Sequence, residues 1–292
     1  MIKIELMKNY EVELVSSFIS EINSIEESHI GYCGIDPLEI AHSLREDITD
    51  IAYNNSFLTV YEEEGKLIGV LGFDADLESK SAEIWGPFIK ENKWDVVSSL
   101  WKKMIALLPK EIESISIFPN KKNRKVLQLA KDHAFNRHSD QTILEFSRGR
   151  INELKEITIL EIEEKYYGEM KDLHDQSFPK TYYSGQDIIS RLNEDRKVFI
   201  VVNDDKLSGY IYVEAEPAYG EASIEFFAVK ESERGKGIGS KLLTVALKWL
   251  FTFESMESIT LCVNSSNQNA INLYKKVGFQ QAHELCFFTK NL

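Results

Sequence analysis

Apolar and polar positions follow one another in the same series of patterns in both halves of the chain. In the C-terminal half, apolar residues recur at helical spacing around Tyr166 to Gln176 and from about Gly237 to Phe253. The turn residues Asn203-Asp204-Asp205 separate two strand-like runs, which is typical of a hairpin. The helices expected in this half are 166–176, 186–193, 237–253 and 267–277, and the expected strands are 198–203, 209–216, 223–229, 258–263 and 283–289. This order predicts a mixed α/β fold around a central sheet.

The N-terminal half repeats this order, which indicates an internal duplication. Lys66-Leu67-Ile68-Gly69 aligns with Lys206-Leu207-Ser208-Gly209. At a slightly larger offset, the residues that align with Asn264, Asn267, Leu273 and Phe279 are Asn120, Asn123, Leu129 and Phe135. The strands expected here are 57–62, 67–75, 82–88, 114–118 and 142–146, and the helices are expected before Tyr53, at 95–108 and at 123–133. The polar segment from Ser147 to Leu154 is the expected linker, so we predict two domains, 1–148 and 156–292.

The charge balance argues against a nucleic-acid partner. Acidic residues outnumber basic ones by 47 to 34, and the net charge of −13 would repel a phosphate backbone. The same field favours a cationic, amine-bearing substrate, although a soluble acidic surface without any binding role would have the same composition.

The cysteines, histidines and apolar segments argue against a disulfide-bonded, metal-binding, secreted or membrane protein. Cys33, Cys262 and Cys286 are scattered and form no C-x-x-C pair, and the six histidines are equally dispersed, so we expect neither disulfides nor a metal. The N-terminus lacks the features of a secretory signal, and no apolar run is long enough to cross a bilayer. We therefore expect a cytoplasmic protein with no membrane partner, either a monomer or a homodimer.

One glycine-rich segment has the context of a phosphate-binding loop. Arg234-Gly235-Lys236-Gly237-Ile238-Gly239-Ser240 follows an expected strand and opens an expected helix. Glycines let the main chain adopt positive φ and approach a ligand closely, so that backbone N–H groups converge on phosphate oxygens. A Walker loop would need Ser or Thr after Lys236, and a dinucleotide fingerprint would need its third small residue one place after Gly239; both fit poorly.

The segment resembles the acyl-CoA loop of the GNAT acetyltransferase superfamily, through Arg234, Gly237 and Gly239. Phe227-Ala228-Val229 stands where the family's strand binds the pantetheine arm, and the runs 264–270 and 273–279 resemble its second motif. The resemblance covers about residues 156–292 and implies a central, mostly antiparallel sheet with acetyl-CoA as co-substrate. The residues that it assigns to acetyl-CoA are Phe227, Ala228, Val229, Arg234, Gly235, Lys236, Gly237, Ile238, Gly239, Ser240 and Asn267.

The resemblance also implies an acid and a base. Tyr274 occupies the place of the family's general acid, although it could equally be a packing residue with a satisfied hydroxyl. Glu225 is the candidate general base, with a solvated or substrate-holding carboxylate as the alternative. Strand alternation would place Glu225 and Phe227 on one face, opposite Ile224 and Phe226.

Two tyrosines stand where related enzymes shape the acceptor pocket. Tyr182 and Tyr183 lie in the loop between the first two helices of the C-terminal half, and they could hold an amine through cation–π contacts and hydroxyl groups. A packing role is an equally good interpretation. The function that these features imply is acetyl transfer to a primary amine of a small molecule or peptide by direct attack. The alternatives are an acyl-CoA-sensing module without catalysis and a scaffold that binds a partner.

The N-terminal copy lacks the same chemistry. Lys90-Glu91-Asn92-Lys93-Trp94-Asp95 replaces the glycine loop, and Ala130 replaces the tyrosine. We therefore expect residues 1–148 to form a degenerate GNAT-like domain that does not bind acetyl-CoA.

Overall fold

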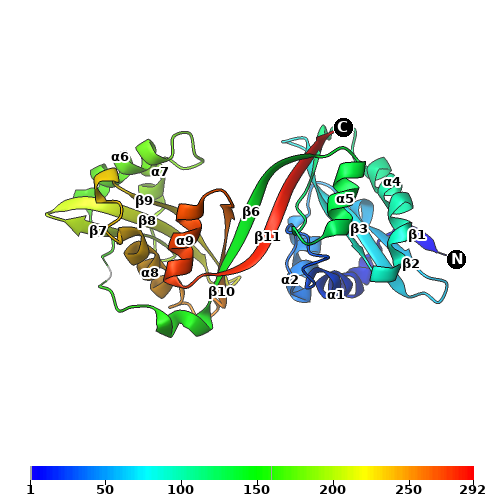
Figure 1. Cartoon of the computed structure of the whole chain (residues 1–292), viewed down its shortest axis with the longest axis horizontal. Coiled ribbons are helices and arrows are strands. Elements are labelled where there is room, and N and C mark those ends of the chain that lie inside the picture. The colour runs from blue at the N-terminus through cyan, green and yellow to red at the C-terminus, as the bar shows by residue number, and fades with distance from the viewer. Residues whose placement is uncertain (1, 159) are drawn as a thin grey trace. The chain divides into compact units, whose positions relative to one another are not determined.

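The computed structural model describes residues 2–158 and 160–292, and the chain divides into two compact units (Figure 1). Unit 1 is formed by the chain up to Gln141 together with His283–Leu292, and unit 2 is Thr142–Ala282. The expected domains 1–148 and 156–292 are continuous segments. In the structure, the boundaries of the units fall instead within the last strand of each half, β6 (Asn136–Ser147) and β11 (Gln280–Asn291), so each of these strands belongs partly to both units. The expected α/β fold, with one sheet-centred unit for each half, is confirmed.

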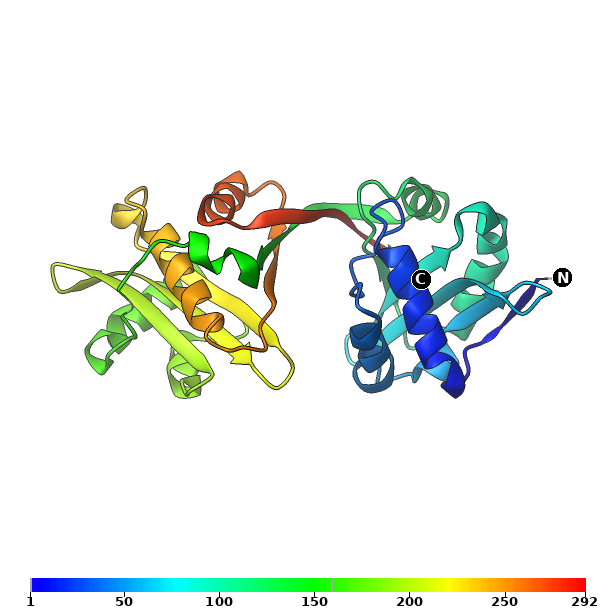
Figure 2. The same ribbon diagram turned by 90° about the horizontal axis from the view of Figure 1, so that it is seen from below.

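The sheet of unit 1 is mostly antiparallel. Its strands, in spatial order, are β1 (Lys3–Leu6), β2 (Leu58–Tyr61), β3 (Leu67–Asp76), β4 (Ser81–Ile89), β5 (Ser114–Ile117), β11 (Gln280–Asn291) and β6 (Asn136–Ser147). The strands β4 and β5 run parallel, whereas the pairs β1–β2, β2–β3, β3–β4 and β5–β11 are antiparallel. The α-helices of the unit are α1 (Val12–Asn23), α2 (Pro37–His42), α3 (Tyr53–Ser56), α4 (Val97–Leu107) and α5 (Arg124–Asp132). Figure 2 shows α1 lying across one face of the sheet.

Unit 2 has a three-layer arrangement. The strands β7 (Arg196–Asn203), β8 (Lys206–Glu216) and β9 (Glu221–Val229) form a separate antiparallel sheet. The strand β10 (Ser258–Asn264) pairs with β6 and is the last strand of the sheet that contains β11 and β6. Helices α6 (Tyr167–Ser177) and α7 (Gly185–Arg191) precede this sheet, and α8 (Ile238–Leu250) and α9 (Gln268–Val277) follow it.

The alternation of side chains along β8 explains why helices cover both faces of the three-stranded sheet. Ile211 and Val213 belong to the core formed with α8, whereas Tyr210 and Tyr212 belong to the core formed with α6. All four side chains are fully buried, so β8 has no face in contact with solvent. The strand therefore separates two apolar cores within one unit.

The internal duplication predicted from the sequence is visible in how two helices begin. Asn123 accepts a hydrogen bond from the Val126 backbone N–H at the start of α5, and Asn267 accepts one from the Ala270 N–H at the start of α9. These two asparagines align in the repeat, and asparagine is among the preferred N-cap residues. The same capping interaction therefore begins the corresponding helix of each half.

The expected linker is an ordered part of unit 2. Arg148–Glu153 forms a 3₁₀ helix, and the Arg148 side chain donates to the carbonyls of Met256 (2.6 Å) and Phe251 (3.1 Å). Phe251 is the C-cap of α8, so this cation satisfies a carbonyl group at the C-terminal end of the helix, where the helix dipole is negative. No helix in the described residues is long and apolar enough to cross a membrane.

The end of the chain completes the sheet of unit 1. Phe288 to Asn291 of β11 pair antiparallel with Ile117 to Ser114 of β5. Cys286 and Phe288 are buried in the core of this unit. Because β11 lies between β5 and β6, removing its contacts would leave one edge of each of these two strands unpaired.

We predict that Phe288→Ala destabilises unit 1 by about 3 to 5 kcal/mol, because it leaves a cavity in the core. Leu292→Ala is the matched control, since Leu292 is 55% exposed and its truncation should change stability by less than about 0.5 kcal/mol. Hydrogen exchange should accelerate in β3 to β5 of Phe288→Ala and stay unchanged in β7 to β9. Equal acceleration in both units would contradict the assignment of β11 to unit 1.

Candidate active site

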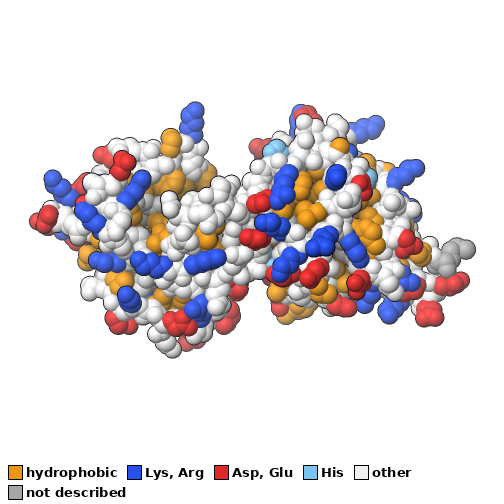
Figure 3. Space-filling model, viewed as in Figure 1, with side chains coloured by type: hydrophobic (Ala, Val, Ile, Leu, Met, Phe, Trp, Pro, Cys, Tyr) orange, Lys and Arg blue, Asp and Glu red, His pale blue; other side chains and the backbone are white. Residues whose placement is uncertain are grey.

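A cavity of about 680 Å³ lies at the end of β9 in unit 2. Its walls come from the end of β9, the loop that follows, the first turn of α8, the end of α6 and one face of α9. The lining residues are Ser177, Phe178, Phe227, Ala228, Val229, Glu233, Arg234, Gly235, Gly237, Ile238, Gly239, Ser240, Asn269, Leu273 and Lys276. Figure 3 shows apolar side chains in a hollow on this unit, with Lys and Arg side chains around it.

The glycine loop leaves the start of α8 without a side-chain cap. Gly235 and Gly237 have φ of 78° and 80°, a left-handed conformation that side chains other than glycine rarely adopt. Gly237 is the N-cap of α8, and no side chain hydrogen-bonds to the backbone at this helix start in the described structure. A Cβ added at either glycine would meet no atom within 4 Å. The first backbone N–H groups of α8 therefore face open space, at the positive end of the helix dipole.

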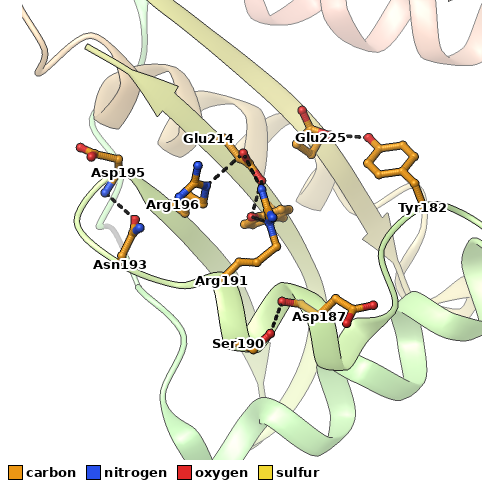
Figure 4. Close-up of polar contacts among 10 residues, drawn as sticks. Tyr182, Asp187, Ser190, Arg191, Asn193, Asp195, Arg196, Glu214 and Glu225 are labelled. Atoms are coloured by element: carbon orange, nitrogen blue, oxygen red, sulfur yellow. Dashed lines mark hydrogen bonds and ion pairs between the residues drawn. The ribbon is translucent and has the colours of Figure 1, made fainter. Parts of the chain in front are cut away.

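The strand that leads to this loop carries a β-bulge. Tyr212 of β8 pairs with Phe226, but Val213 pairs with Ile224, so Glu225 is an extra residue on β9. Ile224 and Phe227 pack against the core beneath α8, whereas Phe226 lies in the core beneath α6. Glu225 points to the α6 side, where it accepts a hydrogen bond from the Tyr182 hydroxyl (Figure 4). The expectation that Glu225 and Phe227 share a face is wrong, because the bulge interrupts the alternation.

Aromatic residues surround this carboxylate. The Tyr182 ring lies 5.0 Å from Phe226 and 4.7 Å from Tyr183, and Phe178 lies 5.2 Å from Phe226. Partial desolvation of the hydroxyl and its hydrogen bond to Glu225 raise the pKa of Tyr182, which therefore stays protonated and donates. Phe178 also lines the cavity, so this aromatic group reaches from the cavity wall to Glu225.

Comparison with known proteins identifies the C-terminal half. Residues 159–279 match the model of the acetyltransferase (GNAT) family. These residues belong to the GNAT family. The expected resemblance is confirmed for this part of the chain, which we call the GNAT domain.

Curated relatives of this chain are acetyltransferases for several amines. The chain is 32% identical over 108 residues to an N-alpha-acetyltransferase of Sulfurisphaera tokodaii, which covers 33% of this chain and 65% of the relative. It is 34% identical over 68 residues to a spermine/spermidine N(1)-acetyltransferase of Bacillus subtilis, covering 23% and 45%. It is 32% identical over 80 residues to a mycothiol acetyltransferase of Corynebacterium aurimucosum, covering 27% and 25%. The chain thus spans less than two thirds of the length of each of these relatives.

Solved structures show that the whole chain shares its fold with proteins of this family. A GCN5-related N-acetyltransferase from Sphaerobacter thermophilus aligns with a TM-score of 0.67 at 12% identity, over 99% of this chain and 95% of that one. A tandem GNAT protein from the clavulanic acid biosynthesis pathway aligns with a TM-score of 0.58 at 14% identity, over 100% and 98%. At these identities the likeness concerns the fold alone.

Most of the residues assigned to acetyl-CoA line the cavity of the GNAT domain; Lys236 and Asn267 do not. Lys236 Nζ binds Glu233 Oε1 at 2.9 Å, and this hydrogen bond holds the pKa of the Glu233 carboxyl below its usual range. Asn267 Oδ1 caps α9 by accepting from the Ala270 N–H at 3.2 Å. Sequence reasoning missed Ser177, Phe178, Glu233, Asn269, Leu273 and Lys276.

The spacing of three missed residues was a usable signal. Asn269, Leu273 and Lys276 stand at positions i, i+4 and i+7 of α9, which places them on one helix face. Gly239 packs against this face, because a Cβ added there would lie 3.0 Å from Leu273 Cδ2. The requirement for a small residue at position 239 therefore comes from the contact between α8 and α9.

Tyr274 lies beside the cavity and is largely buried. Its side chain belongs to the core of the GNAT domain, is 9% exposed, and contacts Phe227 and Phe279 at ring distances of 6.1 and 5.4 Å. Burial raises the pKa of its hydroxyl to about 12, so the phenol keeps its proton at neutral pH. The ring has the packing role that the sequence left open, and the hydroxyl keeps a proton to donate.

The segment of unit 1 that aligns with the glycine loop of unit 2 has a different structure. Glu91–Val96 forms a 3₁₀ helix where the GNAT domain has its glycine loop. Lys125 Nζ lies 5.4 Å from the Trp94 ring centroid and donates to the Glu91 carbonyl at 3.0 Å. A separate cavity of about 720 Å³ lies here, lined by Trp94, Pro87 and the basic start of α5. Ala130 is buried at the position that aligns with Tyr274.

We predict that Gly237→Ala destabilises unit 2 by about 1 to 2 kcal/mol, because alanine is strained in the left-handed conformation. Gly168→Ala, in the first turn of α6, is the matched control, since it also meets open space and has no positive φ. It should be neutral or stabilise by up to about 1 kcal/mol. Urea denaturation of both variants measures the difference, and equal stabilities would contradict the loop geometry.

Proposed function

We propose that unit 2 is an acetyl-CoA-dependent N-acetyltransferase that transfers an acetyl group to a primary amine of a small molecule or peptide by direct attack. The observation that carries this proposal is the uncapped start of α8, which opens behind Gly235 and Gly237 into a cavity of about 680 Å³. Backbone N–H groups in this arrangement favour an anion such as a diphosphate.

The residues present fit acetyl-CoA. The N–H groups of 235–240 would bind the diphosphate, and Arg234 and Lys276 would add positive charge at the cavity wall. The pantetheine arm would follow Phe227 to Val229, since β9 is the edge strand of its sheet in the described structure. When bound, acetyl-CoA supplies an activated thioester carbonyl.

Glu225 would accept the proton that the amine must lose, either directly or through water. Glu225 is the bulged residue of β9, and its carboxylate lies beside the rings of Tyr182 and Phe226, which could bind an organic cation. The Tyr182 hydroxyl fixes the direction of the carboxylate by donating to it. The relatives named for spermidine and N-alpha acetylation, together with the net charge of −13, favour a cationic amine as acceptor.

Tyr274 would donate to the sulfur that leaves. Because its pKa is about 12, the phenol is protonated at physiological pH but is a weak acid. A hydrogen bond to the departing thiolate, with proton transfer as the C–S bond breaks, is the role that this pKa suits. For unit 1 we propose no binding of acetyl-CoA, because the 3₁₀ helix and Ala130 replace the loop and this tyrosine.

The test is a thiol-release assay with acetyl-CoA and a panel of polyamines, aminoglycoside-like amines and peptide N-termini. We predict that Tyr274→Phe lowers kcat by about 100-fold, at the lower end of general acid–base catalysis, with an unchanged Kd for CoA. Tyr219→Phe is the control, since Tyr219 is 70% exposed in the turn before β9 and should behave as wild type.

Three outcomes separate the alternatives. Unaltered kcat in Tyr274→Phe discards the acid assignment. Tight CoA binding without turnover on any amine supports the sensing module in place of the enzyme. Absence of CoA binding to the wild type contradicts the proposed function as a whole.

A further inference from the structure

The loop between α6 and α7 is held through the backbone of Tyr183. His174, which is fully buried, places Nε2 at 2.8 Å from the Tyr183 carbonyl and Nδ1 at 2.5 Å from the Tyr210 hydroxyl. A carbonyl only accepts, so Nε2 carries the proton and Nδ1 accepts from Tyr210. Burial raises the pKa of Tyr210, which keeps this hydroxyl a donor. One imidazole therefore ties the loop to β8.

The Tyr183 side chain is held from another direction by Arg191, the last residue of α7. The guanidinium carbon of Arg191 lies 4.2 Å from the centroid of the Tyr183 ring, within cation–π distance. The same guanidinium binds Glu214 on β8 through Nη2, at 3.0 Å to Oε1 and 3.2 Å to Oε2 (Figure 4). A planar group can stack on a ring and bind a carboxylate in a fork at the same time, which lysine cannot do.

Glu214 is an ionised anchor for this arginine. Burial raises the pKa of its carboxyl, but hydrogen bonds from Tyr212, Arg196 and Arg191 outweigh burial and leave the pKa below its usual range. Arg196 Nε binds Glu214 Oε2 at 3.1 Å. Two arginines therefore share one carboxylate. Of these two, only Arg191 has a cation–π contact with an aromatic ring among the described residues.

These contacts form a continuous series that ends at the candidate base. Glu214 fixes Arg191, Arg191 fixes the ring of Tyr183, and Tyr183 supports Tyr182 in an edge contact of 4.7 Å. Tyr182 then donates to Glu225. The orientation of the Tyr182 hydroxyl thus depends on a guanidinium that itself has no contact with Glu225 in the described structure.

We propose that Arg191 is a positioning residue that sets the affinity for the acceptor amine, by holding the Tyr182-Tyr183 pair against Glu225. This inference rests on the proposed function, since it takes the surroundings of Glu225 as the acceptor site. Arg191 is not among the described residues that line the cavity, so its removal should loosen the acceptor wall and leave the acetyl-CoA side unchanged.

The kinetic test compares Arg191→Met with Arg196→Met. Both variants remove one of the two arginines from Glu214, but only the first removes the contact with Tyr183. We expect Arg191→Met to raise the acceptor KM about tenfold, with kcat and the KM for acetyl-CoA within about twofold of wild type. Arg196→Met should leave all three constants within about twofold. Equal effects of the two variants would overturn the inference, because the effect would then come from Glu214.

A second readout does not depend on turnover. Lys180 lies in this loop before Thr181, is exposed, and offers trypsin a cleavage site. We expect Arg191→Met to increase the rate of tryptic cleavage after Lys180 about tenfold and Arg196→Met to leave this rate unchanged. The rate is measured by mass spectrometry of the full-length chain, with or without acetyl-CoA. An unchanged rate in Arg191→Met would overturn the positioning role even if no acceptor amine were found.

A matched pair at Tyr183 covers the case in which Arg191→Met fails to fold. Tyr183→Phe keeps the ring that Arg191 contacts and should retain the wild-type cleavage rate. Tyr183→Leu removes the ring, keeps both ion pairs of Glu214, and should raise the cleavage rate as Arg191→Met does. A wild type that turns over no amine contradicts the proposed function, whereas equal cleavage of these two variants contradicts this inference.

Discussion

The exposed N–H groups at the start of α8 are the constraint on which the rest of unit 2 depends. A helix start without a capping side chain leaves polar groups without partners unless water or a ligand satisfies them. Gly235 and Gly237 make this start possible, because their positive φ values turn the chain into the helix with no side chain over the cavity. Gly239 then lets α9 approach, so that Leu273 closes one wall.

The bulge in β9 links this anion-binding end to the acceptor end. Without the extra residue, Glu225 and Phe227 would point the same way and the carboxylate would enter the core beneath α8. With it, Phe227 lines the cavity while Glu225 meets Tyr182 on the α6 side. One strand therefore presents the thioester-side wall and the candidate base on different faces, and the proposed chemistry requires both within reach of the reacting atoms.

Periodicity and turn residues predict nearly every helix and strand of the chain, because their boundaries are set locally. The strand β1 was missed, since Lys3–Leu6 has too few residues to show a period. The bulge at Glu225 was missed because it is a property of the register with β8, which the sequence of β9 alone does not contain. The pairing of β11 with β5 was missed for the same reason: apolar alternation shows that a strand forms but does not name its partner.

The candidate site was predictable where backbone conformation follows from residue type. Glycines at 235 and 237 indicate the loop. The spacing of Asn267 before α9 also predicts an N-cap, which the structure shows, whereas its assignment to the cofactor stays a prediction. The contacts of Arg191 with Glu214 and Tyr183 join three elements that are distant along the chain, so no local pattern indicates them.

Amide hydrogen exchange with and without CoA tests the central claim most directly. Protection by CoA should be concentrated in residues 235–240 at the start of α8, with residues 91–96 of unit 1 unchanged. Protection at 91–96, or an unprotected loop in a protein that binds CoA, would contradict the assignment of the diphosphate to the backbone of this loop.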